Sequence, residues 1–300
     1  MLKIVQMMFP DPGTRTKTVM KAAFAGLSVI AGLALAGQVT ATTVISYPDF
    51  SSVAGLTLNG DAAQVGNVLR VTPAIDSQAG SAFSTSTVSL ASSASFSTYF
   101  QFQFTNPDLG FCDGQGCGAD GLVFVVQTVS NNVGGAGGGI GYAGIPNSVG
   151  IEFDTWNNGG GDNNSSNHVG IDVNGSVSSL VIAEVTEADM NNGDVWNAWV
   201  DYNGGTNLLE VRLTRSATRP VSAIVSLVRD LGADLGSTNA FVGFTSGTGA
   251  SHANHDVLTW VLEDEFAPID GGGDGNGVPV PAPLALLGLG IVGLGFSRKR

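Results

Sequence analysis

Side chains of the kinds that bind metal ions are concentrated in one short part of the sequence, residues 149–174. Two carboxylates, Glu152 and Asp154, alternate with apolar residues, so in an extended strand they would share one face. Burying two like charges in a sheet is unfavourable unless a cation lies between them. The loop that follows supplies three more potential ligands, which are Asn158, Asp162 and His168. The pattern therefore predicts a cation site, and the alternative is a solvated strand followed by a polar turn.

The donor types indicate which cations such a site would take. Carboxylate, amide and backbone carbonyl oxygens are hard donors that suit calcium, whereas a single imidazole suits a transition-metal ion. A neighbouring pair of ions fits this mixed set. The formal net charge of −13 agrees with a cation binder, and it argues against a nucleic-acid partner because phosphates would be repelled.

The rest of the chain has the composition of an all-β protein. Its 300 residues include 43 glycines and only 12% charged residues, and short apolar runs recur between turn residues. Phenylalanines in residues 96–104 share one face of a period-two segment, and the apolar run 122–126 predicts a strand covered on both faces. Residues 203–205 predict a hairpin turn. Without any long helical period, we expect one two-sheet sandwich over residues 46–266.

The first 41 residues have the features of a secretory signal peptide. Lys17 and Lys21 precede an apolar run, residues 22–37, and small residues follow at 39–41, where cleavage is expected. Met20 is a second potential start of translation. The alternative is a membrane-spanning helix, but the run is short and rich in alanine and glycine. We therefore expect an exported protein.

The opposite end carries a second apolar segment. An acidic, glycine-rich tether, residues 267–277, precedes residues 278–300, which end in basic side chains suited to the cytoplasmic side of a membrane. This last segment resembles the PEP-CTERM sorting signal in its Val-Pro-x-Pro-Ala form, with Val280 where that family usually has glutamate. The resemblance implies inner-membrane anchoring during sorting, processing by an exosortase in a Gram-negative bacterium, and a final place at the cell surface or in an exopolysaccharide matrix. An ordinary C-terminal membrane anchor is the alternative.

The chain has two cysteines, Cys112 and Cys117. An exported chain meets oxidising conditions, so we expect this pair to form a disulfide that closes a tight loop. Two thiolates without a second pair of ligands argue against a structural zinc site.

Taken in order, the segments between residues 50 and 265 resemble the L-type (legume-type) lectin family. The sequences LTLNGDA from Leu56 and GSAF from Gly80 resemble the opening strands of that family, and FSTYFQFQF from Phe96 resembles the next strand. The resemblance implies an all-β, concanavalin A-like jelly-roll sandwich of two antiparallel sheets. It also implies four loops that together build one sugar site.

The first two of these loops carry a carboxylate and a glycine run. In the sequence ADG, Asp120 matches the family's sugar-binding aspartate, which a cis peptide bond after the preceding alanine holds in place. A carboxylate there can accept hydrogen bonds from two sugar hydroxyls, while an ordinary β-turn is the alternative. In the glycine run 134–144, the resemblance places the sugar-contacting backbone amide near Gly138, and the alternative is a flexible low-complexity loop. The other implied contacts are the ring of Trp156, which stacks on the sugar, the amide of Asn158, and His252 and Asn254 as adjustable contacts of the last loop. The alternatives are that Trp156 is a core residue and that His252 and Asn254 belong to a solvated loop.

The acidic segment is the third loop, and the resemblance assigns each ligand a role. The implied ligands are Glu152 and His168 for a transition-metal ion, usually manganese, Asp154 and Asp162 for both ions, and Asn158 with the carbonyl of Trp156 for calcium. Asn163 or Asn164 could share the role of Asp162, because the interval after Asn158 is longer than in many plant members. Calcium would draw the amide oxygen of Asn158 inward and leave its NH₂ group facing the sugar.

Three classes of function follow from these patterns. The first is an exported, calcium-dependent lectin that binds glycans or exopolysaccharide and is not an enzyme. The second is a structural matrix or adhesion protein that keeps the metals but binds no sugar. The third is a glycoside hydrolase, since laminarinase-like enzymes share this sandwich and carry a Glu-x-Asp-x-x-Glu strand. Retaining hydrolysis needs two carboxylates about 5 Å apart, but no second glutamate follows Asp154 within reach, and residue 157 is asparagine.

Overall fold

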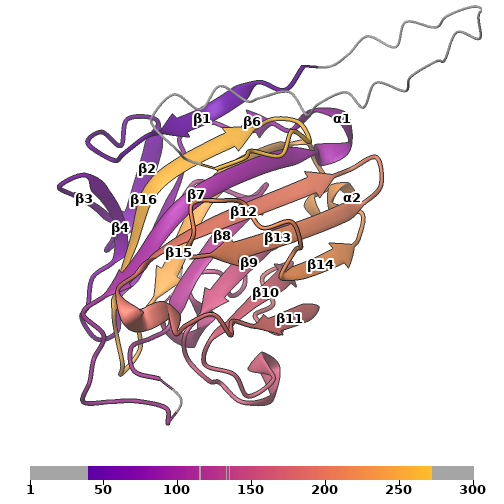
Figure 1. Cartoon of the computed structure of the whole chain (residues 1–300). Helices are drawn as coiled ribbons and strands as arrows, with labels where there is room; N and C mark the ends of the chain where they lie inside the picture. The colour runs from indigo at the N-terminus through magenta and orange to yellow at the C-terminus, as the bar shows by residue number, and fades with distance from the viewer. Residues whose placement is uncertain (1–39, 115, 133, 135, 272–300) are drawn as a thin grey trace, which may run out of the picture. The chain divides into compact units, whose positions relative to one another are not determined.

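The computed structural model describes residues 40–271, except residues 115, 133 and 135, and these residues form two antiparallel sheets packed face to face (Figure 1). The all-β sandwich expected from the sequence is therefore confirmed. The predicted signal peptide lies almost wholly outside the described residues, and so do the sorting segment and most of the tether. Within the described part, no helix has the length and apolar character needed to cross a membrane.

Each sheet contains eight strands in the described part of the chain. Sheet A has the order β14 (Val225–Val228), β13 (Leu208–Thr214), β12 (Val195–Asn203), β7 (Phe96–Thr105), β16 (Asn254–Glu263), β4 (Val68–Thr72) and β3 (Ala63–Val65), and β1 (Thr43–Tyr47) also pairs with β16. Sheet B has the order β11 (Val181–Glu184), β10 (His168–Val173), β9 (Ser148–Asp154), β8 (Gly121–Gln127), β15 (Asn239–Gly247), β5 (Ala79–Ser84) and β2 (Leu56–Gly60), and β6 (Val88–Ser89) also pairs with β15.

Helical elements are short and lie between the strands. They are α1 (Ala91–Ala94), α2 (Leu231–Leu235) and three 3₁₀ turns, η1 (Gly137–Gly139), η2 (Gly160–Asp162) and η3 (Met190–Asn192). The predicted turn at residues 203–205 is confirmed, because β12 and β13 form an antiparallel hairpin around it. The first strand begins at Thr43, before residue 46, and its Ile45 contributes to the core.

The main core lies between the two sheets, and alternation along the strands fills it. In β7 the phenylalanines at 96, 100, 102 and 104 are all buried in this core, as the period-two pattern predicts. Strand β8 is buried along its whole length. Its even-numbered apolar side chains join the main core, while Val123 and Val125 pack with Tyr142 in a second, smaller cluster. The continuous apolar run of β8 is thereby explained by two covered faces.

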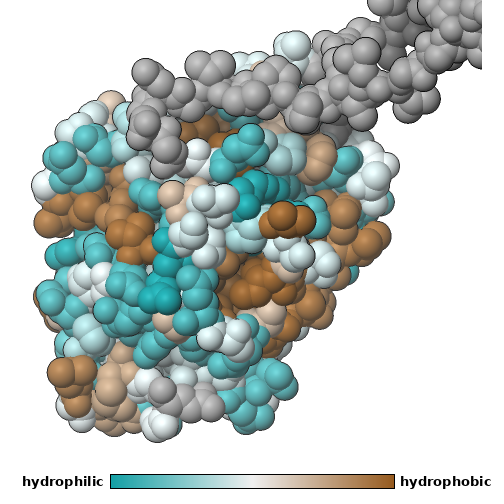
Figure 2. Space-filling view, viewed as in Figure 1, coloured by the Kyte–Doolittle hydropathy of each residue, from teal (hydrophilic) through white to brown (hydrophobic). Residues whose placement is uncertain are grey.

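The surface is mostly polar, with separate apolar patches in the view of Figure 2. Two of the exposed large apolar side chains, Leu109 and Phe111, lie beside the disulfide that joins Cys112 to Cys117. The Cα atoms of these cysteines are 4.3 Å apart, so the expected tight loop is present. We call residues 107–118 the disulfide loop.

Candidate functional site

Neighbouring strands of sheet B place the acidic residues on one face. The apolar residues of β9 at 149, 151 and 153 point into the main core, so Glu152 and Asp154 point away from it. In the ladder between β9 and β10, His168 lies opposite Asp154, and Gly170 lies opposite Glu152. Residues that pair across an antiparallel ladder project to the same side of the sheet, so the pleat brings all of these positions together.

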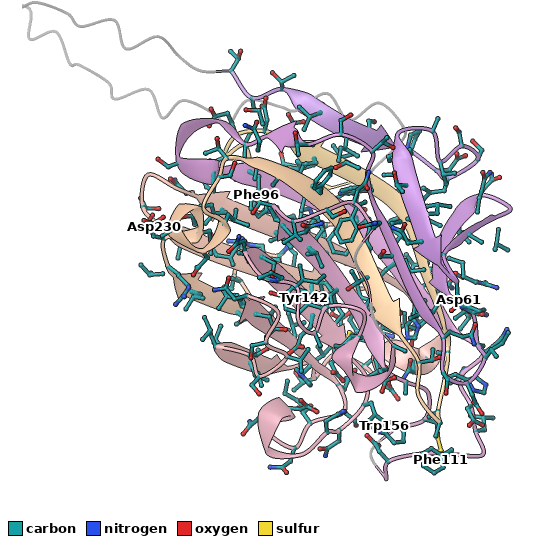
Figure 3. All side chains as sticks on the ribbon, turned by 180° about the vertical axis from the view of Figure 1, so that it is seen from behind. Asp61, Phe96, Phe111, Tyr142, Trp156 and Asp230 are labelled. Carbon is teal, nitrogen blue, oxygen red and sulfur yellow. A yellow bond between two sulfur atoms is a disulfide. The ribbon has the colours of Figure 1, made fainter. Side chains whose placement is uncertain are left out.

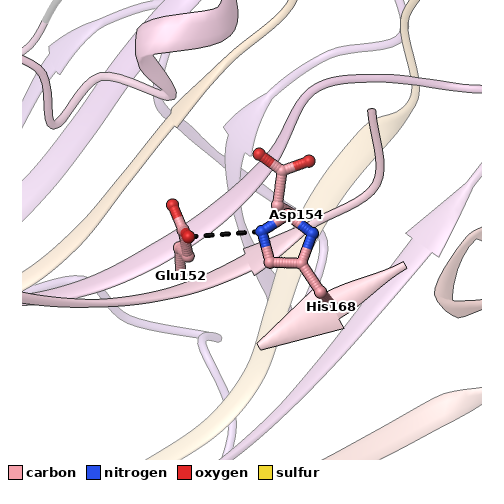
Figure 4. Close-up of side chains that lie close together, drawn as sticks. All are labelled: Glu152, Asp154 and His168. Atoms are coloured by element: carbon pink, nitrogen blue, oxygen red, sulfur yellow. Dashed lines mark hydrogen bonds and ion pairs between the residues drawn. The ribbon is translucent and has the colours of Figure 1, made fainter. Parts of the chain in front are cut away.

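Glu152, Asp154 and His168 form a compact, buried set of potential metal ligands (Figure 4). One ligand atom from each lies within 4.8 Å of the others, and His168 Nε2 is 3.2 Å from Glu152 Oε1. Asp154 Oδ1 also accepts the backbone N–H of Trp156 at 2.7 Å, which ties the following loop to the strand end. Two carboxylates and an imidazole at this spacing can hold a divalent ion.

The loop after β9 turns one more carboxylate inward. Asp162, at the end of η2, is buried, and its Oδ2 accepts the backbone N–H of Asn158. Its neighbours Asn163 and Asn164 are exposed and have left-handed backbone conformations, with φ of 55° and 59°. Of these candidates, Asp162 is therefore the residue that the fold turns toward the acidic strand.

Burial of so many acids in one place disfavours their charged forms. The pKa of Asp154 is raised well above its usual range, first by burial and then by the charge of Glu152. Burial also raises the pKa of Asp162. The pKa of Asp172, on the same face of β10, is raised to about 9, again by burial and then by Glu152. A group of buried acids with raised pKa values requires either protons or a cation.

This electrostatic arrangement makes the effect of metal on stability depend on pH. A buried carboxyl whose folded pKa exceeds its unfolded value of 3.8 destabilises the metal-free protein increasingly as pH rises from that value toward the folded pKa, about 9 for Asp172. We therefore expect the rise in Tm on adding Ca²⁺ and Mn²⁺ to grow between about pH 5 and about pH 8. Thermal melts in EDTA and in the metals, over this range, would measure it. A Tm difference that stays constant with pH would contradict the expectation.

Because Gly170 has no side chain, the Glu152 carboxylate can occupy the space next to its Cα atom. A Cβ atom at this position would overlap with the Glu152 carboxylate and with the Ser179 hydroxyl. We expect Gly170→Ala to displace Glu152 and weaken binding of a transition-metal ion about tenfold or more, as titration calorimetry with Mn²⁺ would show. Gly160→Ala is the matched control, because a Cβ there has no neighbouring atom within 4 Å. Equal affinities of the two variants would argue against Glu152 as a ligand.

Asp120 lies at the end of β8, next to the acidic strand. Its peptide bond with Ala119 is cis, as the family resemblance implies. Its backbone N–H donates to Gly247, and its carbonyl accepts the N–H of Thr155 at 2.9 Å, which connects it to the loop after β9. The residue is 5% exposed, burial raises the pKa of its carboxyl to about 7, and Oδ2 has no hydrogen-bond partner among the described residues. A buried carboxylate oxygen without a partner indicates a position where a ligand can donate.

Glycines from two other loops lie against the side chains of Asn158 and Asp120. A Cβ atom at Gly138 would be 2.6 Å from the side-chain nitrogen of Asn158, so the amide of Asn158 lies directly against η1. A Cβ atom at Gly249 would be 3.5 Å from Asp120 Oδ2. Asn158 is exposed. The structure thus brings Asp120, Gly138 and Asn158 to the same end of sheet B as the acidic cluster.

Trp156 lies between these groups without joining either core. The side chain is half-buried and stacks on Phe111, with ring centroids 5.6 Å apart and planes inclined by 13°. In the sequence, Trp156 lies between the end of the acidic strand at Asp154 and Asn158. Of the two interpretations of Trp156 offered by the sequence, the geometry favours a surface aromatic.

The two residues predicted in the last loop have different surroundings. His252 is partly exposed, and its Nδ1 is 2.8 Å from Asp76 Oδ1. Asn254 is buried, its Oδ1 accepts the N–H of Ala74 at 2.7 Å, and its Nδ2 donates to Thr105 at 3.1 Å. Because both the oxygen and the nitrogen of the Asn254 amide form hydrogen bonds inside the protein, the structure does not support Asn254 as an adjustable sugar contact.

Two residues beside the acidic cluster, Asp172 and Ser179, were not predicted from the sequence. Asp172 follows His168 and Gly170 on alternate positions of β10, so a period-two reading of this strand could have identified it. Ser179 donates a hydrogen bond to Asp172 at 2.8 Å and also reaches Glu152. Ser179 lies in the loop after β10, and only the fold brings it back to the acidic strand.

Comparisons with known proteins identify the family to which this sandwich belongs. The legume lectin domain matches residues 42–271, and the chain belongs to this family. It is 32% identical over 231 residues to the L-type lectin-domain containing receptor kinase VIII.1 of Arabidopsis thaliana, with 74% of this chain and 30% of the kinase aligned. It is 29% identical over 252 residues to a lectin of Pisum sativum, covering 76% of this chain and 85% of that lectin.

The similarity extends to solved structures. The lectin from Bauhinia forficata in complex with GalNAc superposes with a TM-score of 0.63 at 24% identity, over 75% of this chain and 98% of that one. This likeness confirms the legume lectin jelly roll. The legume lectin domain and the solved lectins that share its fold are carbohydrate-binding proteins rather than enzymes, in agreement with the sequence prediction. The chain spans less than a third of the receptor kinase, so the similarity to that protein concerns its lectin domain.

Proposed function

We propose that this protein is a calcium-dependent lectin that binds glycans reversibly where Asp120, Gly138 and Asn158 meet. The observation that carries the proposal is the buried Asp120 carboxylate, whose Oδ2 lacks a partner among the described residues. Hydroxyl groups of a sugar can donate to such an oxygen, and charge-assisted hydrogen bonds of this type are the strong ones. Gly138 and Gly249, which lie against Asn158 and Asp120, have no side chains that would keep a ligand away from the backbone.

The buried donors beside this position fit a pair of divalent ions. Oxygen donors together with one imidazole suit calcium and a transition-metal ion such as manganese. The residues that would hold them are Glu152 and His168 for the transition-metal ion, Asp154 and Asp162 for both, and Asn158 with the carbonyl of Trp156 for calcium. When bound, the ions would neutralise the buried carboxylates and fix the Asn158 amide, which leaves its NH₂ group available to the sugar.

Hydrolysis is not proposed, because the strand lacks the third acidic group. Asn157 occupies the position of the second glutamate in the Glu-x-Asp-x-x-Glu pattern of laminarinase-like enzymes. Its amide forms hydrogen bonds within the loop. Its Oδ1 accepts the N–H of Gly159 and its Nδ2 donates to the carbonyl of Asn164, both at 2.8 Å. Glu152 and Asp154, the two carboxylates that remain, are buried beside His168.

We also propose that the protein is exported and acts at the cell surface or in an extracellular polysaccharide matrix. The support comes from the sequence: basic residues before an apolar run at one end, and the PEP-CTERM-like segment 278–300 at the other. An exosortase would then process the C-terminal segment after transient anchoring in the inner membrane. The disulfide between Cys112 and Cys117 suits an oxidising compartment.

A glycan array tests the central proposal. We expect the purified protein to bind a restricted set of glycans in Ca²⁺ and Mn²⁺, and to lose that binding in EDTA. Restoring Ca²⁺ should restore it. If the metal-loaded protein binds no glycan, while the metals still raise its Tm, the structural matrix function is the correct one. Release of reducing ends from β-glucans on long incubation would instead indicate a hydrolase.

A further inference from the structure

The disulfide loop places an aromatic ring beside the proposed sugar site. Phe111 is 49% exposed, although large aromatic side chains in this sandwich are mostly buried. Figure 3 shows Phe111 and Trp156 close together at one end of the molecule, with the disulfide next to them. The two rings stack nearly in parallel, 5.6 Å apart at their centroids. Phe111 and Trp156 therefore form one continuous aromatic surface beside the site.

Several interactions hold Phe111 in this position. Its carbonyl accepts a hydrogen bond from Ser251 Oγ at 2.8 Å, which connects the disulfide loop to the last loop of the site. Asp113, also in the disulfide loop, accepts the backbone N–H of Asn157 at 3.0 Å, and this contact connects the loop to the segment that carries Asn158. Cys112, which lies between these two attached residues, is joined to Cys117 by the disulfide that closes the loop. A ring fixed in advance loses little entropy when a ligand stacks on it.

The side chains of the disulfide loop indicate which class of sugar it could bind. A flat, exposed aromatic ring suits the apolar face of a pyranose. The carboxylates of Asp108 and Asp113 lie in the same loop, and the chain carries a net charge of −13, so an anionic sugar would be repelled. The neighbouring Leu109 is even more exposed, at 78%, but it offers no ring.

From these observations we propose that Phe111 forms a second subsite, which stacks on the sugar unit adjacent to the one held by Asp120. The ligand is then a neutral oligosaccharide or polysaccharide, bound more tightly than its terminal monosaccharide. This proposal rests on the proposed lectin function. It adds a contact that belongs to the disulfide loop of this chain.

Titration calorimetry on the full protein in Ca²⁺ and Mn²⁺ tests the subsite. The probes are methyl glycosides of galactose, N-acetylgalactosamine, glucose and mannose, and neutral di- and tetrasaccharides that end in each of these sugars. For the sugar that binds, we expect the tetrasaccharide to bind about three- to tenfold more tightly than the methyl glycoside. Phe111→Ala and Phe111→Leu should remove this preference and leave the affinity for the methyl glycoside within about twofold.

Two controls separate stacking from general effects of the loop. Leu109→Ala removes an exposed apolar side chain from the same loop, and Phe111→Tyr keeps the ring, so both should retain the preference. Phe111→Leu keeps the apolar volume, and it carries the test if the alanine variant does not fold. Size-exclusion chromatography of the same variants reports whether Phe111 instead mediates self-association.

The outcomes distinguish this proposal from the lectin function itself. If the wild type binds a methyl glycoside but shows no preference for longer chains, or if both Phe111 variants keep that preference, the subsite is refuted and the lectin function stands. Equal loss of methyl glycoside and tetrasaccharide affinity would show that Phe111 only supports Trp156, and it also refutes the subsite. If the wild type binds none of these probes and nothing on the glycan array, both proposals fail.

Discussion

Exchange of Asp154 for asparagine is expected to abolish metal binding and glycan binding together. Asp154 is the carboxylate assigned to both ions, and it is buried beside Glu152 and His168. Loss of its charge should weaken Ca²⁺ binding at least about 30-fold, since removing one partner of a buried charge interaction costs about 2 to 5 kcal/mol. Titration with Ca²⁺ and Mn²⁺, followed by the glycan array, would measure both losses in one preparation.

The same variant should not be less stable than the wild type when both are free of metal. Burial and the charge of Glu152 raise the pKa of Asp154 well above its usual range, so its ionised form destabilises the metal-free fold. A Tm in EDTA equal to or higher than that of the wild type would show that the carboxylate serves the ions and not the fold. Asp194→Asn, at a partly exposed residue paired with Arg215, is the control that should leave metal and glycan binding intact. Unchanged Ca²⁺ affinity in Asp154→Asn would refute the metal assignment.

Exchange of Asp120 for asparagine should separate the two activities by abolishing glycan binding while metal binding persists. The substitution keeps the shape of the side chain but removes the charge from the unpaired oxygen. A hydrogen bond to a charged group contributes about 1.5 to 3 kcal/mol, so the loss of even one should weaken glycan binding about 10- to 150-fold. Calorimetry with the best glycan from the array measures this loss, and Ca²⁺ titration checks that the metal site is intact.

Asp76→Asn is the matched control for Asp120→Asn. Asp76 is an exposed aspartate in contact with His252, so the control also reports whether the last loop contributes to binding. A strong effect of Asp76→Asn would make His252 a contact worth changing directly. If Asp120→Asn instead loses Ca²⁺ together with the glycan, Asp120 acts through the metal centre, to which its carbonyl is joined by the N–H of Thr155. Full glycan affinity in Asp120→Asn would refute the sugar site.

The contrast between these variants follows from how the two groups are held. Asp154 is a strand residue whose direction is fixed by the pleat of β9, and it faces the ladder partner His168. Asp120 lies at the end of the adjacent strand, where β8 pairs with β9 and β15. In the proposed function, neighbouring strands would thus supply one carboxylate for cations and another for the sugar. Separate effects on metal and sugar are therefore expected even though the groups are close.

The sequence by itself determined the features that depend on local backbone geometry. Because side chains alternate along a strand, the amino-acid sequence of β9 predicts that Glu152 and Asp154 share one face and that the apolar residues share the other. The same rule predicted the buried phenylalanines of β7 and the doubly covered β8. The two cysteines could pair only with each other within the chain, and they do.

Only the tertiary structure decided which loop residues reach the site. Asn158 and Asn254 are both asparagines in polar stretches of the sequence. Asn158 is exposed and lies against Gly138, whereas Asn254, the first residue of β16, is buried and bonded to Ala74 and Thr105. Phe111 meets Trp156 because two distant loops meet at one end of the sheets. No periodicity fixes the course of a loop, since its path depends on contacts with residues far away in the chain. The strands could therefore be predicted from the sequence, whereas the ligand-facing side chains required the packing of the whole sandwich.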